Sequence, residues 1–264
     1  MNYSKNILGE KISYQESAKA LIISRELTID EVLKSIKECQ YSSIVDRLRK
    51  LLNNNEEQKY RDEKKNLPAV CFCGTFNKSR SKENLKQYNN LIVIDLDKLN
   101  SEEMQRLKSC FEADDYIYSF WLSPSGKGFK GLVALDYKFN ISQYDIHECH
   151  RAAFVKLSQY FFEKYSVELD QQCKDIPRLC FVSADRELHL KQKIEYFPVL
   201  ESDLAKKVDN STQKKQGAVR RHHVKRTTQG VTISPDVLLN PSGKNSPQDR
   251  YRIQSIIKYL SKRK

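Results

Sequence analysis

The pattern of apolar and polar stretches divides the chain into short buried strands and longer amphipathic helices. Residues 91–94 are four consecutive apolar side chains, too few for a helix of their own, and they predict a buried strand. Residues 116–122, 132–135 and 179–182 predict further strands, and residues 69–76 are also β-prone. Apolar residues at helical spacing separate several of these strands. The pattern therefore predicts a fold of the α+β class.

Residues 1–66 are predicted to form a helical N-terminal segment. Thr28 and Glu31 fit a capping box, and apolar residues then recur at helical spacing. The charged run at residues 56–65 is expected to be a solvated face. The segment carries no catalytic signal and is expected to pack beside the main sheet. Further helices are predicted at residues 101–110 and 141–165.

Two carboxylates follow the buried run at residues 91–94. Asp95 and Asp97 are two residues apart, and on a strand such residues point to the same face. Carboxylates held that close repel one another unless a cation lies between them, and their hard oxygen atoms suit Mg²⁺ or Mn²⁺. The alternative is a strand end that runs into a solvated turn.

The loop between the strands at 116–122 and 132–135 is rich in Gly, Ser and Lys. Such a hairpin tip exposes backbone N–H groups and lysines, which suits phosphate oxygens. It lacks the spacing and the following helix of a P-loop, and an ordinary hairpin is the alternative. The candidate phosphate-binding residues of the loop are Ser123, Ser125, Gly126, Lys127, Gly128 and Lys130.

A third carboxylate and a guanidinium follow further along the chain. Asp170 follows a short stretch that contains the apolar residues Val167 and Leu169. Arg178 immediately precedes the strand predicted at 179–182. Gathered near the first two carboxylates, they would complete a site for metal and triphosphate. Asp175 and Asp185 are rivals for the role of third carboxylate.

The seven cysteines are scattered, so neither a disulfide framework nor a zinc site is predicted. Cys71 and Cys73 alternate on one strand and are expected to be core residues rather than metal ligands. His147 and His150 are expected to be partly exposed helix residues, because no zinc-peptidase or relaxase spacing is present.

The charge balance favours polyanionic partners, above all nucleic acid. The net charge is +12 and the isoelectric point is near 9.2. Residues 201–233 are predicted to be a basic flexible linker, and residues 234–264 to contain a helix that docks or begins a further domain. The chain shows no signal peptide and no membrane span, so a cytoplasmic location is expected. The candidate DNA-binding residues are Lys78, Arg80, Lys82, Arg220, Arg221, Lys225 and Arg226.

Three blocks in order carry a resemblance to a known superfamily: Asp95-x-Asp97, the loop from Ser123 to Lys130, and Asp170 followed by Arg178. This order resembles the catalytic core of the archaeo-eukaryotic primases, or primase-polymerases. More narrowly, it is similar to the VirE N-terminal-like primase domain of mobile-element and phage proteins. The phrases Leu67-Pro-Ala-Val, Gly74-Thr-Phe and Arg178-Leu-Cys-Phe-Val-Ser fit that family too. The resemblance spans roughly residues 60–200, and the core is placed at 67–200.

The resemblance implies a palm with an RRM-like sheet beside an α/β module. It also implies that Asp95, Asp97 and Asp170 hold Mg²⁺ or Mn²⁺, while the residues 125–130 loop and Arg178 bind the triphosphate of an NTP or dNTP. A 3′-hydroxyl would attack the α-phosphorus in line, on a single-stranded DNA template. A replicative helicase would work in cis or in trans.

The chain departs from many primase-polymerases at one position. Lys130 stands where these enzymes have histidine in a Ser-x-His pattern. Lysine can bind phosphate but cannot donate a proton and remain neutral in the manner of imidazole. The narrower family favours lysine here. The leading hypothesis is a primase or primase-polymerase that replicates a mobile element or phage; a primase-derived DNA-binding or replication-initiation module and a metal-dependent nuclease are the alternatives.

Overall fold

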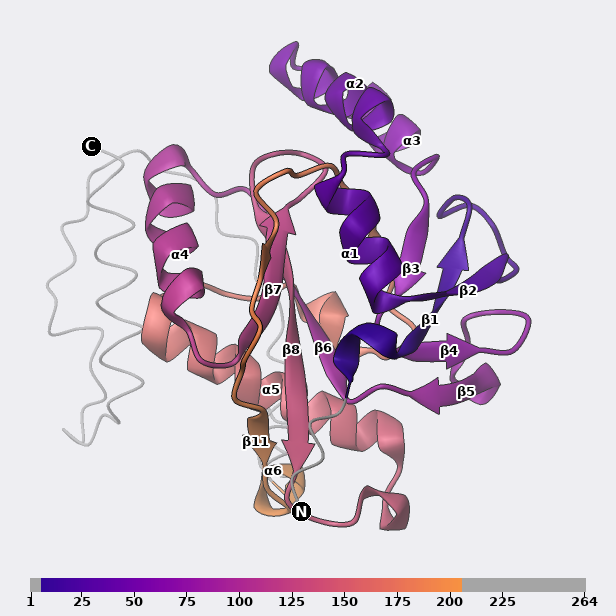
Figure 1. Cartoon of the computed structure of the whole chain (residues 1–264), viewed down its shortest axis with the longest axis vertical. Coiled ribbons are helices and arrows are strands. Elements are labelled where there is room, and N and C mark those ends of the chain that lie inside the picture. Colours follow the sequence, from indigo (N-terminus) through magenta and orange to yellow (C-terminus); the bar gives the residue numbers. More distant parts are fainter. Residues whose placement is uncertain (1–5, 206–264) are drawn as a thin grey trace, which may run out of the picture. The chain divides into compact units, whose positions relative to one another are not determined.

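The structure, a computed structural model, describes residues 6–205, and a five-stranded sheet lies at its centre (Figure 1). Strand β8 pairs antiparallel with β6 on one side and β7 on the other, so residues 117–133 form the predicted hairpin. The parallel strand β11 continues along β8, and β10 pairs with β7. The strands are β6 (Leu91–Leu96), β7 (Ile117–Leu122), β8 (Phe129–Tyr137), β10 (His189–Leu190) and β11 (Phe197–Val199).

Both faces of this sheet are buried, as the run of apolar residues in β6 predicts. Ile92 and Ile94 pack in the cluster that contains the two long helices, whereas Leu91 and Val93 pack in the cluster on the opposite face. Strand alternation therefore directs Asp95 away from the long helices. These helices are α4 (Ser101–Ala113) and α5 (Ile146–Tyr165).

A second, four-stranded sheet packs on the face opposite the long helices. Its order is β2-β1-β3-β9, and all of its pairs are antiparallel. Helix α1 buries Val32, Leu33 and Ile36 in the shared core. The members of this layer are η1 (Ile7–Gly9), β1 (Lys11–Gln15), β2 (Arg25–Thr28), α1 (Ile29–Lys37), β3 (Ala69–Cys71) and β9 (Cys180–Phe181).

The prediction of a purely helical N-terminal segment is wrong in part. The capping box at Thr28 and Glu31 is confirmed. However, the segment also supplies the strands β1 and β2. Strand β1 was missed because two of its buried side chains, Ser13 and Gln15, are polar and do not stand out in the apolar pattern. The Ser13 hydroxyl accepts a hydrogen bond from the Phe76 N–H, and the Gln15 amide donates to the Ala20 carbonyl oxygen.

Helices α2 and α3 form a small layer of their own beside the second sheet. Helix α2 buries Val45 and Leu48 in a cluster with Leu67, Val182 and Ala184. This cluster joins α2 to the segment that follows β9, and so to the neighbourhood of the hairpin. The helices are α2 (Ser42–Asn53) and α3 (Glu57–Lys64).

Several predicted elements have different bounds in the structure. The β-prone run at 69–76 is two strands in different sheets, since β4 pairs with β5 rather than continuing β3. The strand predicted at 179–182 is only two residues long in β9 and joins the second sheet, not the central one. The remaining elements before α5 are β4 (Gly74–Phe76), η2 (Lys82–Asn84), β5 (Leu85–Tyr88) and η3 (Ile141–Gln143).

The described fold ends with η4 (Gln171–Lys174), β9 to β11 and α6 (Ser202–Ala205). The basic linker beyond residue 205 and the helix predicted in residues 234–264 lie outside the described residues. Within residues 6–205, no helix has the length and apolar character needed to cross a membrane.

Candidate functional site

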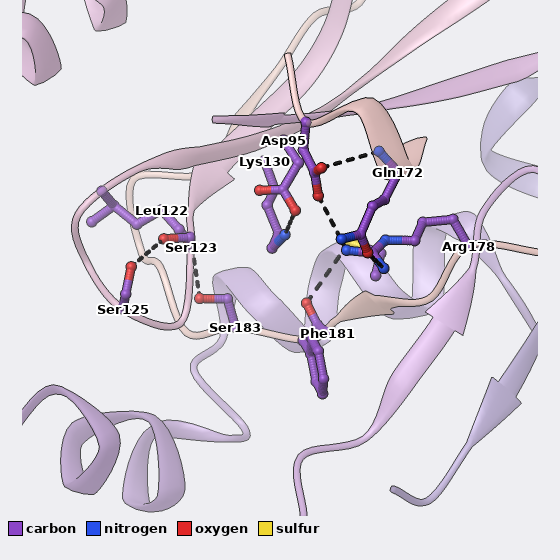
Figure 2. A network of polar contacts seen from close by, with 11 residues as sticks. Asp95, Leu122, Ser123, Ser125, Lys130, Gln172, Arg178, Phe181 and Ser183 are labelled. Atoms are coloured by element: carbon purple, nitrogen blue, oxygen red, sulfur yellow. Dashed lines mark hydrogen bonds and ion pairs between the residues drawn. The ribbon is translucent and has the colours of Figure 1, made fainter. Parts of the chain in front are cut away.

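The site begins where β6 ends and β8 starts. Asp95 and Lys130 face one another across these strands and form an ion pair, seen at the centre of Figure 2. The side chains of Lys130 and Asp95 are only 4% and 9% exposed. Lys130 therefore lies in strand β8 and not in the loop, where it was predicted to be. Within the protein it is paired with the Asp95 carboxylate.

This buried pair leaves one oxygen atom without a hydrogen bond. Burial disfavours the charged form of Lys130, but the attraction of Asp95 outweighs it and raises the pKa of Lys130 above its usual value. Lys130 binds Oδ2 of Asp95, while Oδ1 is buried and has no hydrogen-bond partner among the described residues. A buried carboxylate oxygen in this state is costly unless another cation or donor reaches it.

Asp170 is brought to Asp95 by a backbone contact between distant parts of the chain. The Asp170 N–H donates to the carbonyl oxygen of Asp95 at 3.0 Å. The Asp170 carboxylate caps η4 through the Gln172 N–H at 3.0 Å and pairs with Arg178 at 3.1 Å. Ligand atoms of Asp95, Asp170 and Cys173 all lie within 4.8 Å of one another. Two of the three predicted carboxylates, and the predicted guanidinium, are thus side by side.

The two rival carboxylates have structural partners elsewhere. Asp175 accepts two hydrogen bonds from Arg151 on α5, at 3.0 and 3.3 Å. Asp185 is buried and accepts from the N–H groups of Leu122 and Glu187, at 2.8 and 3.0 Å. Of the three candidates, Asp170 is the one that lies beside Asp95.

Asp97 lies one residue beyond the end of β6 and is exposed. It is not a member of the group formed by Asp95, Asp170 and Cys173. Its charge nevertheless acts on Lys130, and on Tyr60 and Lys64 of helix α3. Asp97 is therefore at the rim of the site.

The hairpin loop is held tightly against the end of β6. The Ser123 N–H donates to the Gly128 carbonyl oxygen at 2.9 Å, and the Ser123 and Ser125 hydroxyls are 2.8 Å apart (Figure 2). Gly126 has a φ of +70°, which favours glycine. A Cβ on Gly128 would clash with the Leu96 carbonyl oxygen, so this position requires glycine. The side chain of Lys127 is exposed at the tip.

Three residues of the N-terminal segment reach this site, although sequence reasoning assigned none to it. Arg49 of α2 donates to the carbonyl oxygens of Ser123 and Ala184, at 3.4 and 3.1 Å. Tyr60 forms a side-chain hydrogen bond with Ser125, and burial, then Asp97, raises its pKa to about 12. The Lys64 ammonium lies over the rings of Phe181 and Tyr60. Tyr60 and Lys64 precede Leu67-Pro68, where the core was predicted to begin, whereas no local sequence pattern marks Arg49.

The remaining sequence predictions have mixed outcomes. Cys71 and Cys73 are buried in the core, as predicted. The prediction for His150 is wrong: it is fully buried, and its Nδ1 lies 3.0 Å from the Tyr88 hydroxyl. Burial lowers the pKa of His150 to about 4. His147 is partly exposed, as predicted.

The candidate DNA-binding residues fall into two groups. Lys78, Arg80 and Lys82 are exposed in and beside the turn that connects β4 and β5. Their role in binding DNA stays a prediction. The second group lies outside the described residues and consists of Arg220, Arg221, Lys225 and Arg226.

The donor set fits a divalent cation. Asp95 and Asp170 offer oxygen atoms from two parts of the chain, and Asp95 has one oxygen, Oδ1, without a hydrogen-bond partner among the described residues. The Cys173 thiol is a softer donor; burial, then the Asp95 charge, raises its pKa and favours the neutral form. The nearby cations Lys130 and Arg178 add positive charge for an anionic ligand. Such an arrangement suits a metal ion that carries phosphate groups.

Comparison with known proteins gives one family. Residues 62–189 match the family model described as BT4734-like, N-terminal domain. The matched range begins inside α3 and contains Lys64, the hairpin, Asp95 and Asp170 of the site, and Arg178. The description states no activity. The comparison with curated proteins and the comparison with solved structures find no match.

Proposed function

We propose that the described fold is a primase-polymerase core that transfers nucleotides onto a strand growing along single-stranded DNA. The observation that carries this proposal is the meeting of Asp95 and Asp170 beside a Gly/Ser/Lys hairpin, with one buried carboxylate oxygen left without a partner. Antiparallel strands β6, β8 and β7 would be the palm, and the second sheet with α1 to α3 its companion module.

The residues of the chain have distinct tasks in this proposal. Asp95 and Asp170 would hold the metal ion, with Asp97 at the open side. When bound, Mg²⁺ or Mn²⁺ would neutralise phosphate charge and lower the pKa of the attacking 3′-hydroxyl. Arg178 would orient phosphate oxygens, since its Nε is buried without a hydrogen-bond partner among the described residues.

The hairpin and Lys130 would complete the phosphate site. Backbone N–H groups at the glycine-rich tip approach a ligand without Cβ obstruction, and Lys127 adds an exposed positive charge. Lys130 stabilises Asp95 in the protein alone; with a metal ion on Asp95, its ammonium is available to a phosphate oxygen. The proposal assigns no general base to the chain, because a divalent ion held by Asp95 and Asp170 would itself supply the acidification of the 3′-hydroxyl.

A template-directed extension assay tests the proposal. Wild type and an Asp95→Ala/Asp97→Ala double variant are supplied with single-stranded DNA, Mn²⁺ or Mg²⁺, and labelled NTPs or dNTPs, with and without primer. Product that lengthens with wild type and is lost in the variant supports the polymerase, and product without primer supports the primase. Shortening of the template without nucleotides would instead indicate the nuclease.

One observation favours a second candidate function, a DNA-binding module with a vestigial metal site. Lys130 already supplies a counter-charge to Asp95, so the charge of this carboxylate is balanced in the absence of a metal ion, although its Oδ1 accepts no hydrogen bond from the described residues. This candidate predicts no extension product, and equal retention of single-stranded DNA by wild type and the double variant.

A further inference from the structure

We propose that Lys64 of helix α3 binds the outer phosphates of the incoming nucleoside triphosphate. The inference rests on the proposed function and adds a residue from an element that lies outside the strand-and-hairpin motifs. Three observations carry it: what Lys64 touches, which charges surround it, and how firmly α3 is fixed to the hairpin.

The ammonium group of Lys64 is held in place without a carboxylate partner. Its Nζ lies 5.0 Å from the ring centre of Phe181 and 5.7 Å from that of Tyr60. Within residues 6–205, no Asp or Glu is within ion-pair distance of it, whereas Lys130 and Arg178 are each paired with one. Aromatic faces orient a cation but leave its N–H donors without acceptors.

The surrounding charges place Lys64 in the same electrostatic field as the carboxylate site. Burial and then the charge of Lys130 lower the pKa of Lys64; Asp97 and Asp95 act in the opposite direction, and Arg178 adds to the lowering. The positive charges of Lys130 and Arg178 thus both act on Lys64, and this repulsion is unfavourable. A ligand with several negative charges relieves this repulsion.

Helix α3 is fixed against the hairpin that would hold the nucleotide. Tyr60, one turn before Lys64, is hydrogen-bonded to Ser125 of the hairpin loop. Glu63 pairs with Arg47 of α2 at 2.7 Å, and the neighbouring Arg49 anchors α2 to the loop carbonyl of Ser123. Lys64 is therefore presented from a supported helix and not from a mobile arm.

The position of Phe181 links Lys64 to the predicted phosphate-binding residue Arg178. Phe181 is in β9, three residues beyond Arg178, and Figure 2 shows both residues. The Phe181 ring is the nearer of the two rings that contact Lys64. Lys64 and Lys130 would then approach the triphosphate from different elements. Because an amine contacts phosphate as a point charge, the outer phosphates with their greater charge are its expected target.

Nucleotide binding by a Lys64→Ala variant tests the inference. Affinity for a nucleoside triphosphate and for the matching monophosphate is measured by calorimetry with Ca²⁺, for wild type, Lys64→Ala and Lys64→Arg. We expect Lys64→Ala to weaken triphosphate binding by about 10-fold to 100-fold, with little effect on the monophosphate. Lys64→Arg should recover part of the loss. Thermal unfolding of each variant shows whether the fold is retained.

The matched control is Lys65→Ala, because Lys65 is exposed and pairs with Asp62 at 3.0 Å. It should bind the triphosphate as wild type does. Unchanged triphosphate affinity in Lys64→Ala overturns the inference, and so does a loss confined to single-stranded DNA, which would assign Lys64 to the template. If either of these results is found while wild type still extends DNA normally, the proposed function stands and only the role of Lys64 is rejected. If wild type binds no triphosphate, the proposed function and the role of Lys64 are both rejected.

Discussion

Strand β6 and helix α3 reach the same site with opposite charges and by different means. β6 delivers Asp95 from a strand that is buried along its whole length, and the backbone of Asp170 is hydrogen-bonded to it. α3 has no buried residue and delivers Lys64 from a helix held by ion pairs and by Tyr60. The part of the site that carries Asp95 and Asp170, here called the acidic side, thus belongs to the core. The part that carries Lys64, here called the basic side, is attached to the core from the surface.

This difference separates the structural role of a residue from its role towards ligands. On the acidic side, a change to Asp95 would disturb both the proposed metal donors and a buried ion pair. On the basic side, a change to Lys64 would remove the proposed phosphate contact and leave the core intact. The predictions below use this contrast, from the largest expected effect to the smallest.

The largest effect is expected for Asp170→Asn in the extension assay. Asparagine keeps the cap of η4 but removes the charge of the proposed metal ligand, which would be worth several kcal/mol at a phosphoryl-transfer centre. Activity should fall by about 10³-fold, with stability close to that of wild type. Asp175→Asn is the control, since Asp175 pairs with Arg151, and it should retain nearly full activity. Equal activity of both variants would remove Asp170 from the site.

Asp95→Asn should destabilise the fold as well as inactivate it. The variant leaves Lys130 buried without a counter-charge, which costs about 3–5 kcal/mol. Urea denaturation measures this loss, and Asp97→Asn is the control because Asp97 is exposed. The double variant Asp95→Asn/Lys130→Met should recover stability but not activity. If Asp95→Asn is as stable as Asp97→Asn, the buried pair does not contribute as described.

Acid should destabilise the protein through His150, which lies in the core behind the acidic side. Its pKa falls from 6.5 to about 4 on folding, chiefly because of burial. Between these values the unfolded chain binds more protons, so stability decreases as pH falls, by about 3 kcal/mol in all. His150→Gln should flatten this part of the stability curve, whereas His147→Gln should not. If the pH dependence of stability in His150→Gln has the same slope as in wild type, His150 is not the group responsible for the loss of stability in acid.

Arg49→Ala should weaken the attachment of α2 to the hairpin. Arg49 donates to the carbonyl oxygens of Ser123 and Ala184, and loss of these charged donors costs about 2 kcal/mol. The KM for nucleotide should rise more than kcat falls, because in the proposed function the loop would position the phosphates. Arg47→Ala is the control: Arg47 is exposed and pairs only across the surface with Glu63, so it should change stability by less than about 1 kcal/mol.

The acidic side could largely be predicted from sequence, because local patterns encode it. The apolar run before Asp95 predicted β6, and the glycines between 123 and 131 predicted the hairpin. The choice among Asp170, Asp175 and Asp185 could not be made, since it depends on a hydrogen bond between Asp170 and Asp95 that spacing does not reveal.

The basic side could not be predicted, because α3 is polar on every face. The sequence Glu57–Lys64 is typical of a solvent-exposed helix. Which of its side chains face the site depends on long-range contacts to Ser125 and Phe181. Strand β1 was missed for a related reason: its buried Ser13 accepts a hydrogen bond from the distant Phe76 N–H, and its buried Gln15 donates to the Ala20 carbonyl oxygen. Polar groups buried by tertiary contacts leave no periodic signal.

The most direct test of the central claim is a Mn²⁺ titration followed by electron paramagnetic resonance. The signal of free Mn²⁺ is compared for wild type, Asp170→Asn and the control Asp175→Asn, without nucleotide or DNA. We expect wild type and Asp175→Asn to bind Mn²⁺ alike and Asp170→Asn to lose this binding. Equal Mn²⁺ binding by all three proteins would contradict a metal site at Asp95 and Asp170.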